Sequence, residues 1–197
     1  MTVKVGYMGV PFSNTWLKAK EFVEDLGLDA ELVPLICAKD TVEALERGET
    51  DYAVLAYTNN LAGTVKETAD AMKGRILEVV AKGGLDIHHC VFTLSPDVKV
   101  DTVSSHIHAL KQCIRNLRRL YPDAKLSESP DTAYSAQMLA EGKLPGTAAV
   151  LCTRAAGENW GLTLVHENIE DRKDNVTQFV MLRMPRSSPD IPEDLRW

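Results

Sequence analysis

The sequence contains no apolar run long enough to span a membrane, since none approaches the roughly 18 consecutive apolar residues that a span requires. The N-terminal segment also lacks the basic region followed by an apolar stretch that marks a secretory signal. The 4 cysteines are scattered and show neither CxxC nor Cys/His ligand spacing. We therefore expect a cytoplasmic protein that does not bind a membrane and whose cysteines are buried, reduced thiols.

An excess of basic residues is also missing. Lysine and arginine number 22 against 28 acidic residues, which gives a net charge of −6 and argues against nucleic acid as a partner. The GxGxxG, P-loop, GxSxG and HExxH motifs are absent. His88 and His89 are adjacent within an expected strand over residues 87–94, so they point to opposite faces and cannot chelate one metal together. We expect packed or exposed histidines, no cofactor and no metal site.

What the sequence does contain is an alternation of strand-like and helix-like segments from end to end. Residues 3–8 alternate and end at Gly9, and a helical apolar stripe over residues 16–26 stops at Gly27. This alternation predicts an α/β protein with mainly parallel strand pairing. The 197 residues suffice for one ample core or two small lobes.

Helix starts are predicted from short-range capping patterns. Asp40 with Glu43 and Thr64 with Glu67 have the spacing of a capping box. Two further helix starts are expected at Asp131-Thr132 and at Thr153, and one long helix is expected to follow residues 102–106 and end at Tyr121-Pro122.

Polar residues follow the buried strand pattern of residues 52–57, where Thr58, Asn59 and Asn60 stand at the expected carboxyl end of the strand. In an open α/β sheet this edge is where ligands bind, beside helix N-termini that suit anions. A polar turn that bonds only to itself explains the same three residues equally well.

A second polar segment runs from residue 168 to residue 178 and leads into a strand pattern over residues 177–184. The hydroxyl of Thr177 stands at the mouth of this strand, where a rigid strand meets an open loop and a small polar ligand can be held. The alternative is a strand start at which Asn175 and Thr177 make only local backbone hydrogen bonds.

Several stretches, taken together, resemble the prephenate dehydratase family of phenylalanine biosynthesis. Their order and spacing cover nearly the whole chain. The matching stretches are Val5-Gly6-Tyr7-Met8-Gly9, Asp51-Tyr52 with the strand after it, Thr58-Asn59-Asn60, Gly63-Thr64-Val65, residues 105–113, Asp131-Thr132-Ala133, Arg154-Ala155-Ala156, Trp160-Gly161-Leu162, Ile169-Glu170-Asp171 and Asn175-Val176-Thr177 with Phe179.

The resemblance implies two α/β lobes like those of type II periplasmic binding proteins, with an active-site cleft between the lobes. The first lobe would comprise residues 1–75 and 172–185 and the second residues 76–171, followed by an irregular tail over residues 186–197. Family members usually carry a C-terminal ACT domain that binds phenylalanine. This chain ends before one, so we expect the catalytic domain alone, without feedback by that route, as a homodimer.

The resemblance also implies a reaction. Prephenate, a dicarboxylate, loses its ring hydroxyl as water and its ring carboxylate as carbon dioxide to give phenylpyruvate, on the route to L-phenylalanine. Thr177 inherits the position of the proton donor. The substrate contacts implied are Asn59, Asn60, Thr58, Ser105, His106, Thr132, Asn175, Gln178 and Phe179.

Three positions depart from the family pattern. Gln178 stands where the family's Thr-Arg-Phe motif has arginine, while Thr58 and Asn60 replace the glutamate and serine of its Glu-Asn-Ser motif. Loss of a buried charged contact to a dianion costs about 2–5 kcal/mol. Two alternatives therefore stay open beside the dehydratase: a prephenate decarboxylase of the same fold that does not aromatise the ring, and a non-catalytic protein that binds a small anion. Prephenate and arogenate are not distinguished.

Overall fold

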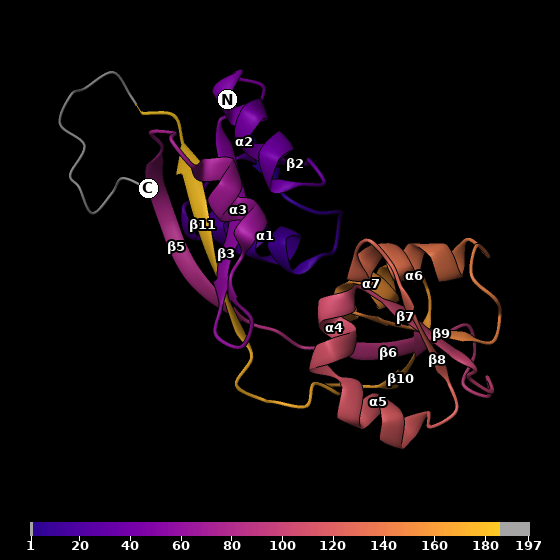
Figure 1. Ribbon diagram of the computed structural model, residues 1–197. Helices are drawn as coiled ribbons and strands as arrows, with labels where there is room; N and C mark the ends of the chain where they lie inside the picture. The colour runs from indigo at the N-terminus through magenta and orange to yellow at the C-terminus, as the bar shows by residue number, and fades with distance from the viewer. Residues whose placement is uncertain (1, 186–197) are drawn as a thin grey trace. The chain divides into compact units, whose positions relative to one another are not determined.

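The computed structural model describes residues 2–185 and divides the chain into two compact units (Figure 1). The first unit holds the chain up to Val10, Asn14–Asp86 and the C-terminal segment from Asn175; the second holds Pro11–Ser13 and Ile87–Asp174. The boundaries thus differ from the expected ones after residues 75 and 171. The reason is that residues 76–86 contain the whole of β5 (Glu78–Asp86), an edge strand of the first sheet. The expected tail, residues 186–197, lies outside the described residues.

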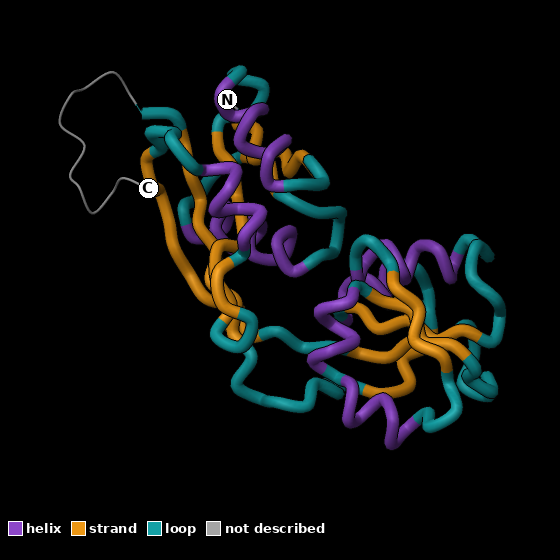
Figure 2. Tube along the Cα trace, viewed as in Figure 1, coloured by secondary structure: helices purple, strands orange, loops and turns teal. Residues whose placement is uncertain are grey.

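The first unit is built on one mixed sheet with the strand order β2-β1-β3-β11-β5, and β4 pairs with β3. Strand β11 lies between β3 and β5 and is antiparallel to both, whereas β1 is parallel to β2 and β3 (Figures 1 and 2). The strands are β1 (Val3–Tyr7), β2 (Ala30–Pro34), β3 (Tyr52–Asn59), β4 (Gly63–Thr64), β5 (Glu78–Asp86) and β11 (Val176–Arg183).

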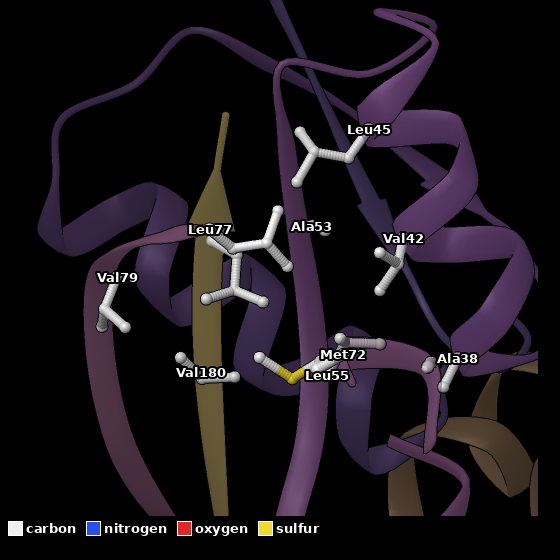
Figure 3. Close-up of a cluster of buried hydrophobic side chains, with 11 residues drawn as sticks. Ala38, Val42, Leu45, Ala53, Leu55, Met72, Leu77, Val79 and Val180 are labelled. Carbon is white, nitrogen blue, oxygen red and sulfur yellow. The ribbon is translucent and has the colours of Figure 1, made fainter. Parts of the chain in front are cut away.

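Helices cover both faces of this sheet. Phe22 of α1 (Asn14–Asp25) packs with Phe179 and Met181 of β11 on one face. On the other face α2 (Ala38–Glu46) and α3 (Lys66–Met72) pack against Val180 and Leu182, and Figure 3 shows part of this second cluster. Neighbouring residues of β11 therefore point to opposite faces, as the period of a strand requires.

The second unit has a sheet with the order β10-β6-β9-β7-β8. Strand β7 pairs in parallel with β8 and β9, while β6 is antiparallel to β9 and β10. Its elements are β6 (Cys90–Thr93), β7 (Thr102–Ser105), α4 (Ile107–Gln112), α5 (Ile114–Leu120), β8 (Lys125–Glu128), α6 (Thr132–Ala140), β9 (Ala148–Cys152), α7 (Arg154–Asn159) and β10 (Thr163–His166). The α/β class is confirmed, but the expectation of mainly parallel pairing is wrong, because each sheet also takes in strands that run against their neighbours.

Two of the predicted helix caps are confirmed. The Asp131 carboxylate accepts from the backbone N–H groups of Ala133 and Tyr134, and Thr153 Oγ1 accepts from Ala156 N–H. Each bond reaches no further than three residues along the chain, so the local sequence contains everything that it needs.

Both predicted capping boxes are wrong. Helix α2 is capped by Cys37, whose Sγ accepts from Asp40 N–H, and the Glu67 carboxylate accepts from Ala38 N–H. Thr64 is paired in β4 instead of capping α3. The expected long helix is interrupted at Cys113, where φ is −116°.

The histidine pair precedes β6 instead of lying within it. His89 is buried, with Nε2 2.9 Å from Gln112 Oε1, whereas the His88 side chain is largely exposed. Within residues 2–185 no three His, Cys, Asp or Glu side chains are grouped to hold a metal ion. Over the same range no helix is long and apolar enough to cross a membrane.

The cysteines follow expectation at three of their positions. Cys90, Cys113 and Cys152 are buried free thiols, and burial raises the pKa of each above its usual range. A raised thiol pKa keeps these groups neutral and unreactive at physiological pH. Cys37 differs, because as the cap of α2 it is only half-buried.

Candidate active site

The polar ends of β3 and β11 meet at one edge of the first sheet. The strand register places Thr177 opposite Asn59 and Gln178 opposite Thr58. The two segments that the sequence offered as separate polar junctions are therefore a single structural feature, created by the pairing of the last strand with the third.

Asn59 is the centre of this junction and is 7 % exposed. Its Oδ1 accepts from the backbone N–H groups of Leu61 and Ala62, both at 2.9 Å. Its Nδ2 donates to Asn175 Oδ1 at 2.8 Å and to Thr177 Oγ1 at 2.9 Å. Because backbone N–H groups can only donate, the orientation of the Asn59 amide is fixed by its surroundings.

This network determines what the Thr177 hydroxyl can do. Its oxygen accepts a hydrogen bond from the Asn59 amide, and no residue in the described part of the chain accepts one from its hydrogen. A hydroxyl whose oxygen already accepts is polarised toward donation. The half-buried Thr177 side chain is therefore prepared to donate its proton or a hydrogen bond to a ligand atom.

Asn60 joins the same two strands through its backbone and side chain. Val176 N–H donates to Asn60 Oδ1 at 2.8 Å, and Asn60 N–H donates to the Val176 carbonyl at 3.0 Å. The interpretation of residues 58–60 as a turn that bonds only to itself is wrong for Asn60, because both of these bonds cross to Val176 of β11. Asn175 is 1 % exposed and likewise holds the junction.

The side chains of Phe179 and Gln178 lie in different surroundings from that of Thr177. Phe179 is 1 % exposed and packs in the core with α1, so we assign it to the core instead of to the ligand contacts. Gln178 lies on the opposite face of β11, over Gly84 of β5.

Ser105, His106 and Thr132, the other expected contacts, belong to the second unit. Ser105 is fully buried and its hydroxyl donates to the Leu151 carbonyl, which accounts for it structurally. His106 caps α4 by accepting from His108 N–H, and burial together with His108 lowers the pKa of its imidazole. Thr132 begins α6 beside its cap Asp131.

Glu170 is a buried group to which sequence reasoning assigned no role, although it lies within the matching Ile169-Glu170-Asp171 stretch. It is 1 % exposed and receives hydrogen bonds from His89 N–H and from the Lys173 ammonium, with His88 Nδ1 3.2 Å away. Burial acts to raise the pKa of Glu170, but these bonds and one from its own N–H outweigh it and hold the pKa below its usual range.

Glu170 should make stability depend on pH. A carboxyl whose pKa is lower in the folded state stabilises the fold above its unfolded value of about 4.3, and this contribution is lost as the pH falls through the folded pKa. Glu170→Gln is expected to lower the free energy of unfolding by about 2 kcal/mol at pH 7 and to flatten its decline below pH ~4.3, as followed by urea unfolding. The exposed Glu167→Gln serves as control. An unchanged pH profile in Glu170→Gln would contradict this role.

The family model described as prephenate dehydratase matches residues 5–187. The chain belongs to the prephenate dehydratase family. It is 33 % identical over 184 residues to arogenate dehydratase 5 of Arabidopsis thaliana, covering 92 % of this chain and 42 % of that protein. It is 28 % identical to the bifunctional chorismate mutase/prephenate dehydratase of Escherichia coli K12, covering 92 % and 47 %.

A solved relative supports the fold assignment. The prephenate dehydratase of Arthrobacter aurescens, determined in complex with L-Phe, superposes with a TM-score of 0.82 at 27 % identity, covering 96 % of this chain and 63 % of that one. The chain therefore spans less than half of the two curated relatives above and less than two thirds of this structure. The predicted family is confirmed, because the family model matches residues 5–187.

Proposed function

We propose that this chain catalyses the decarboxylating dehydration of prephenate to phenylpyruvate. The observation that carries the proposal is the Asn59–Thr177 pair within a chain of this family, because the network leaves the Thr177 hydroxyl as a donor. Asn59 itself is held by two backbone donors and by Asn175, so the hydroxyl is positioned before any ligand arrives.

The chemistry requires little beyond positioning and one proton. The electron pair of the bond to the ring carboxylate moves into the ring as carbon dioxide leaves, and the ring hydroxyl departs with a proton as water. Aromatisation drives the reaction, so the protein must hold the substrate and stabilise the departing oxygen. Thr177 is the group that we assign to that oxygen, donating a hydrogen bond or the proton as the carbon–oxygen bond breaks.

Arogenate is the second candidate substrate, and the 33 % identity to an arogenate dehydratase favours considering it. Arogenate has the same ring, carboxylate and hydroxyl as prephenate but carries an amino group in place of the side-chain ketone. The role of Thr177 is the same for both, because the leaving oxygen is the same. The substrate must therefore be decided by assay.

The test is to incubate the purified protein with prephenate and, separately, with arogenate, and to follow substrate, phenylpyruvate and phenylalanine. Phenylpyruvate formed from prephenate is the expected result. If phenylalanine forms from arogenate faster than phenylpyruvate forms from prephenate, arogenate is the substrate instead of prephenate. Loss of prephenate without phenylpyruvate would indicate the non-aromatising decarboxylase, and binding without turnover would indicate a non-catalytic anion-binding protein.

A further inference from the structure

The second unit has a hollow of about 380 Å³ beside α5, which we call the α5 hollow. It is lined by Arg115, Asn116 and Arg119 of α5 and by Asp171. Arg115 and Arg119 lie four positions apart and therefore on one face of the helix, while Leu117 between them is buried in the core. The volume falls within the roughly 300–1,000 Å³ of pockets that bind small molecules.

The two arginines of the α5 hollow have no carboxylate partner. Within residues 2–185 no acidic side chain forms an ion pair with an arginine of α5, whereas every other arginine of that range has one. These paired arginines are Arg47, Arg75, Arg154, Arg172 and Arg183. Like charges four positions apart destabilise a helix, and a bound anion removes that repulsion. In a chain of net charge −6, this pair of cations favours an anionic ligand.

One of the two guanidinium groups is held in place before any ligand arrives. Asn116 Nδ2 donates to the Ile169 carbonyl at 3.0 Å, and Arg119 Nη2 donates to Asn116 Oδ1 at 3.3 Å. Because a carbonyl can only accept, the orientation of the Asn116 amide is fixed, and its oxygen faces Arg119. The other N–H donors of Arg119 have no partner in the described part of the chain, so they are available to a ligand.

Asp171 adds an acceptor to the lining. Its Oδ2 accepts from Arg115 N–H at 2.9 Å and its Oδ1 from Asn116 N–H at 3.0 Å, so these two backbone donors are occupied and side chains must hold the ligand. A carboxylate has about four lone-pair positions, which leaves Asp171 able to accept a further hydrogen bond. It repels an anion that offers no donor and attracts one that carries a hydroxyl group.

We propose that the α5 hollow binds a small hydroxylated phosphate ester, with Arg115 and Arg119 on the phosphate oxygens and Asp171 accepting from a hydroxyl group of the ligand. Each guanidinium group presents a planar fork of donors that matches phosphate oxygens. Two such groups match the charge of a phosphate monoester, which approaches −2 at pH 7. The site is separate from the Asn59–Thr177 junction, which belongs to the first unit.

Isothermal titration calorimetry on the full chain, at constant ionic strength, tests the proposal. The probes are glycerol phosphate, propyl phosphate, which lacks the hydroxyl groups, and malate, which replaces phosphate with carboxylates. Glycerol phosphate is expected to bind saturably and most tightly. Arg115→Ala and Arg119→Ala should each weaken its binding at least about tenfold, since each removes charge-assisted hydrogen bonds. Arg118→Ala is the matched control, because it removes the same charge from the same helix but outside the lining, and its affinity should stay within about twofold.

Asp171→Asn tests the hydroxyl contact, with circular dichroism to confirm the fold because Asp171 also caps α5. Loss of the negative charge should strengthen the binding of propyl phosphate and abolish the preference for glycerol phosphate. The proposal is overturned if no probe binds saturably, if Arg118→Ala weakens binding as much as the lining variants, or if malate binds most tightly. Loss of binding in Thr177→Ala would also overturn it, since the ligand would then lie at the candidate active site. Binding is measured without turnover, so this result does not depend on the proposed function.

Discussion

Replacing Thr177 with alanine is expected to lower kcat by at least about tenfold, and by about a hundredfold if proton donation is the whole role of the hydroxyl. The fold should persist, because Asn59 Nδ2 keeps its bond to Asn175 Oδ1 when the Thr177 oxygen is removed. The measurement is steady-state turnover of the substrate identified by the product assay, beside a thermal unfolding curve for each variant.

Two companion variants distinguish the effect of losing the Thr177 hydroxyl from the effect of changing its orientation. Thr177→Ser keeps the donor and should retain most activity. Asn59→Asp exchanges the donating amide for a carboxylate that accepts from Thr177, so the hydroxyl hydrogen turns away from the ligand and kcat should fall as in Thr177→Ala. Near-normal turnover in correctly folded Thr177→Ala would remove Thr177 from the mechanism.

Gly157→Ala should have the largest effect on stability, lowering the free energy of unfolding by about 3 kcal/mol through overpacking. Gly157 lies in α7, and a Cβ added there would stand 2.4 Å from ring atoms of Phe92. Phe92 is fully buried in β6, and close-packed protein interiors accommodate an added methyl group poorly. Urea unfolding followed by circular dichroism measures the change.

Gly146→Ala provides the matched control, because its nearest neighbour would be a Leu94 atom at 3.9 Å. Its effect should lie within about 0.5 kcal/mol. Adding Phe92→Leu to Gly157→Ala should recover part of the loss, since the smaller side chain vacates the space that the new methyl group needs. If Gly157→Ala were as mild as the control, the close approach of α7 to β6 would not limit this position.

Short-range features of the sequence predicted the elements that depend on neighbouring residues. The caps at Asp131 and Thr153 are bonds within three residues, so the local sequence contains both partners of each bond. The family was predictable for a different reason: motifs in fixed order across the chain are specific even when each is weak alone. The prediction of a capping box at Asp40 failed because α2 begins earlier, at Ala38. There the carboxylate of Glu67, from another helix, accepts a hydrogen bond from Ala38 N–H.

The α/β class and the family could be predicted from the amino-acid sequence, which also singled out Asn59 and Thr177 as candidate site residues. Three features follow only from the folded chain: the hydrogen bond between these two side chains, the place of Phe179 in the core, and the direction of Gln178 away from Thr177. The physical reason is strand register, since a slip of one residue would exchange the two faces of β11. That register is set by the pairing of β11 with β3 and β5, which come from distant parts of the chain.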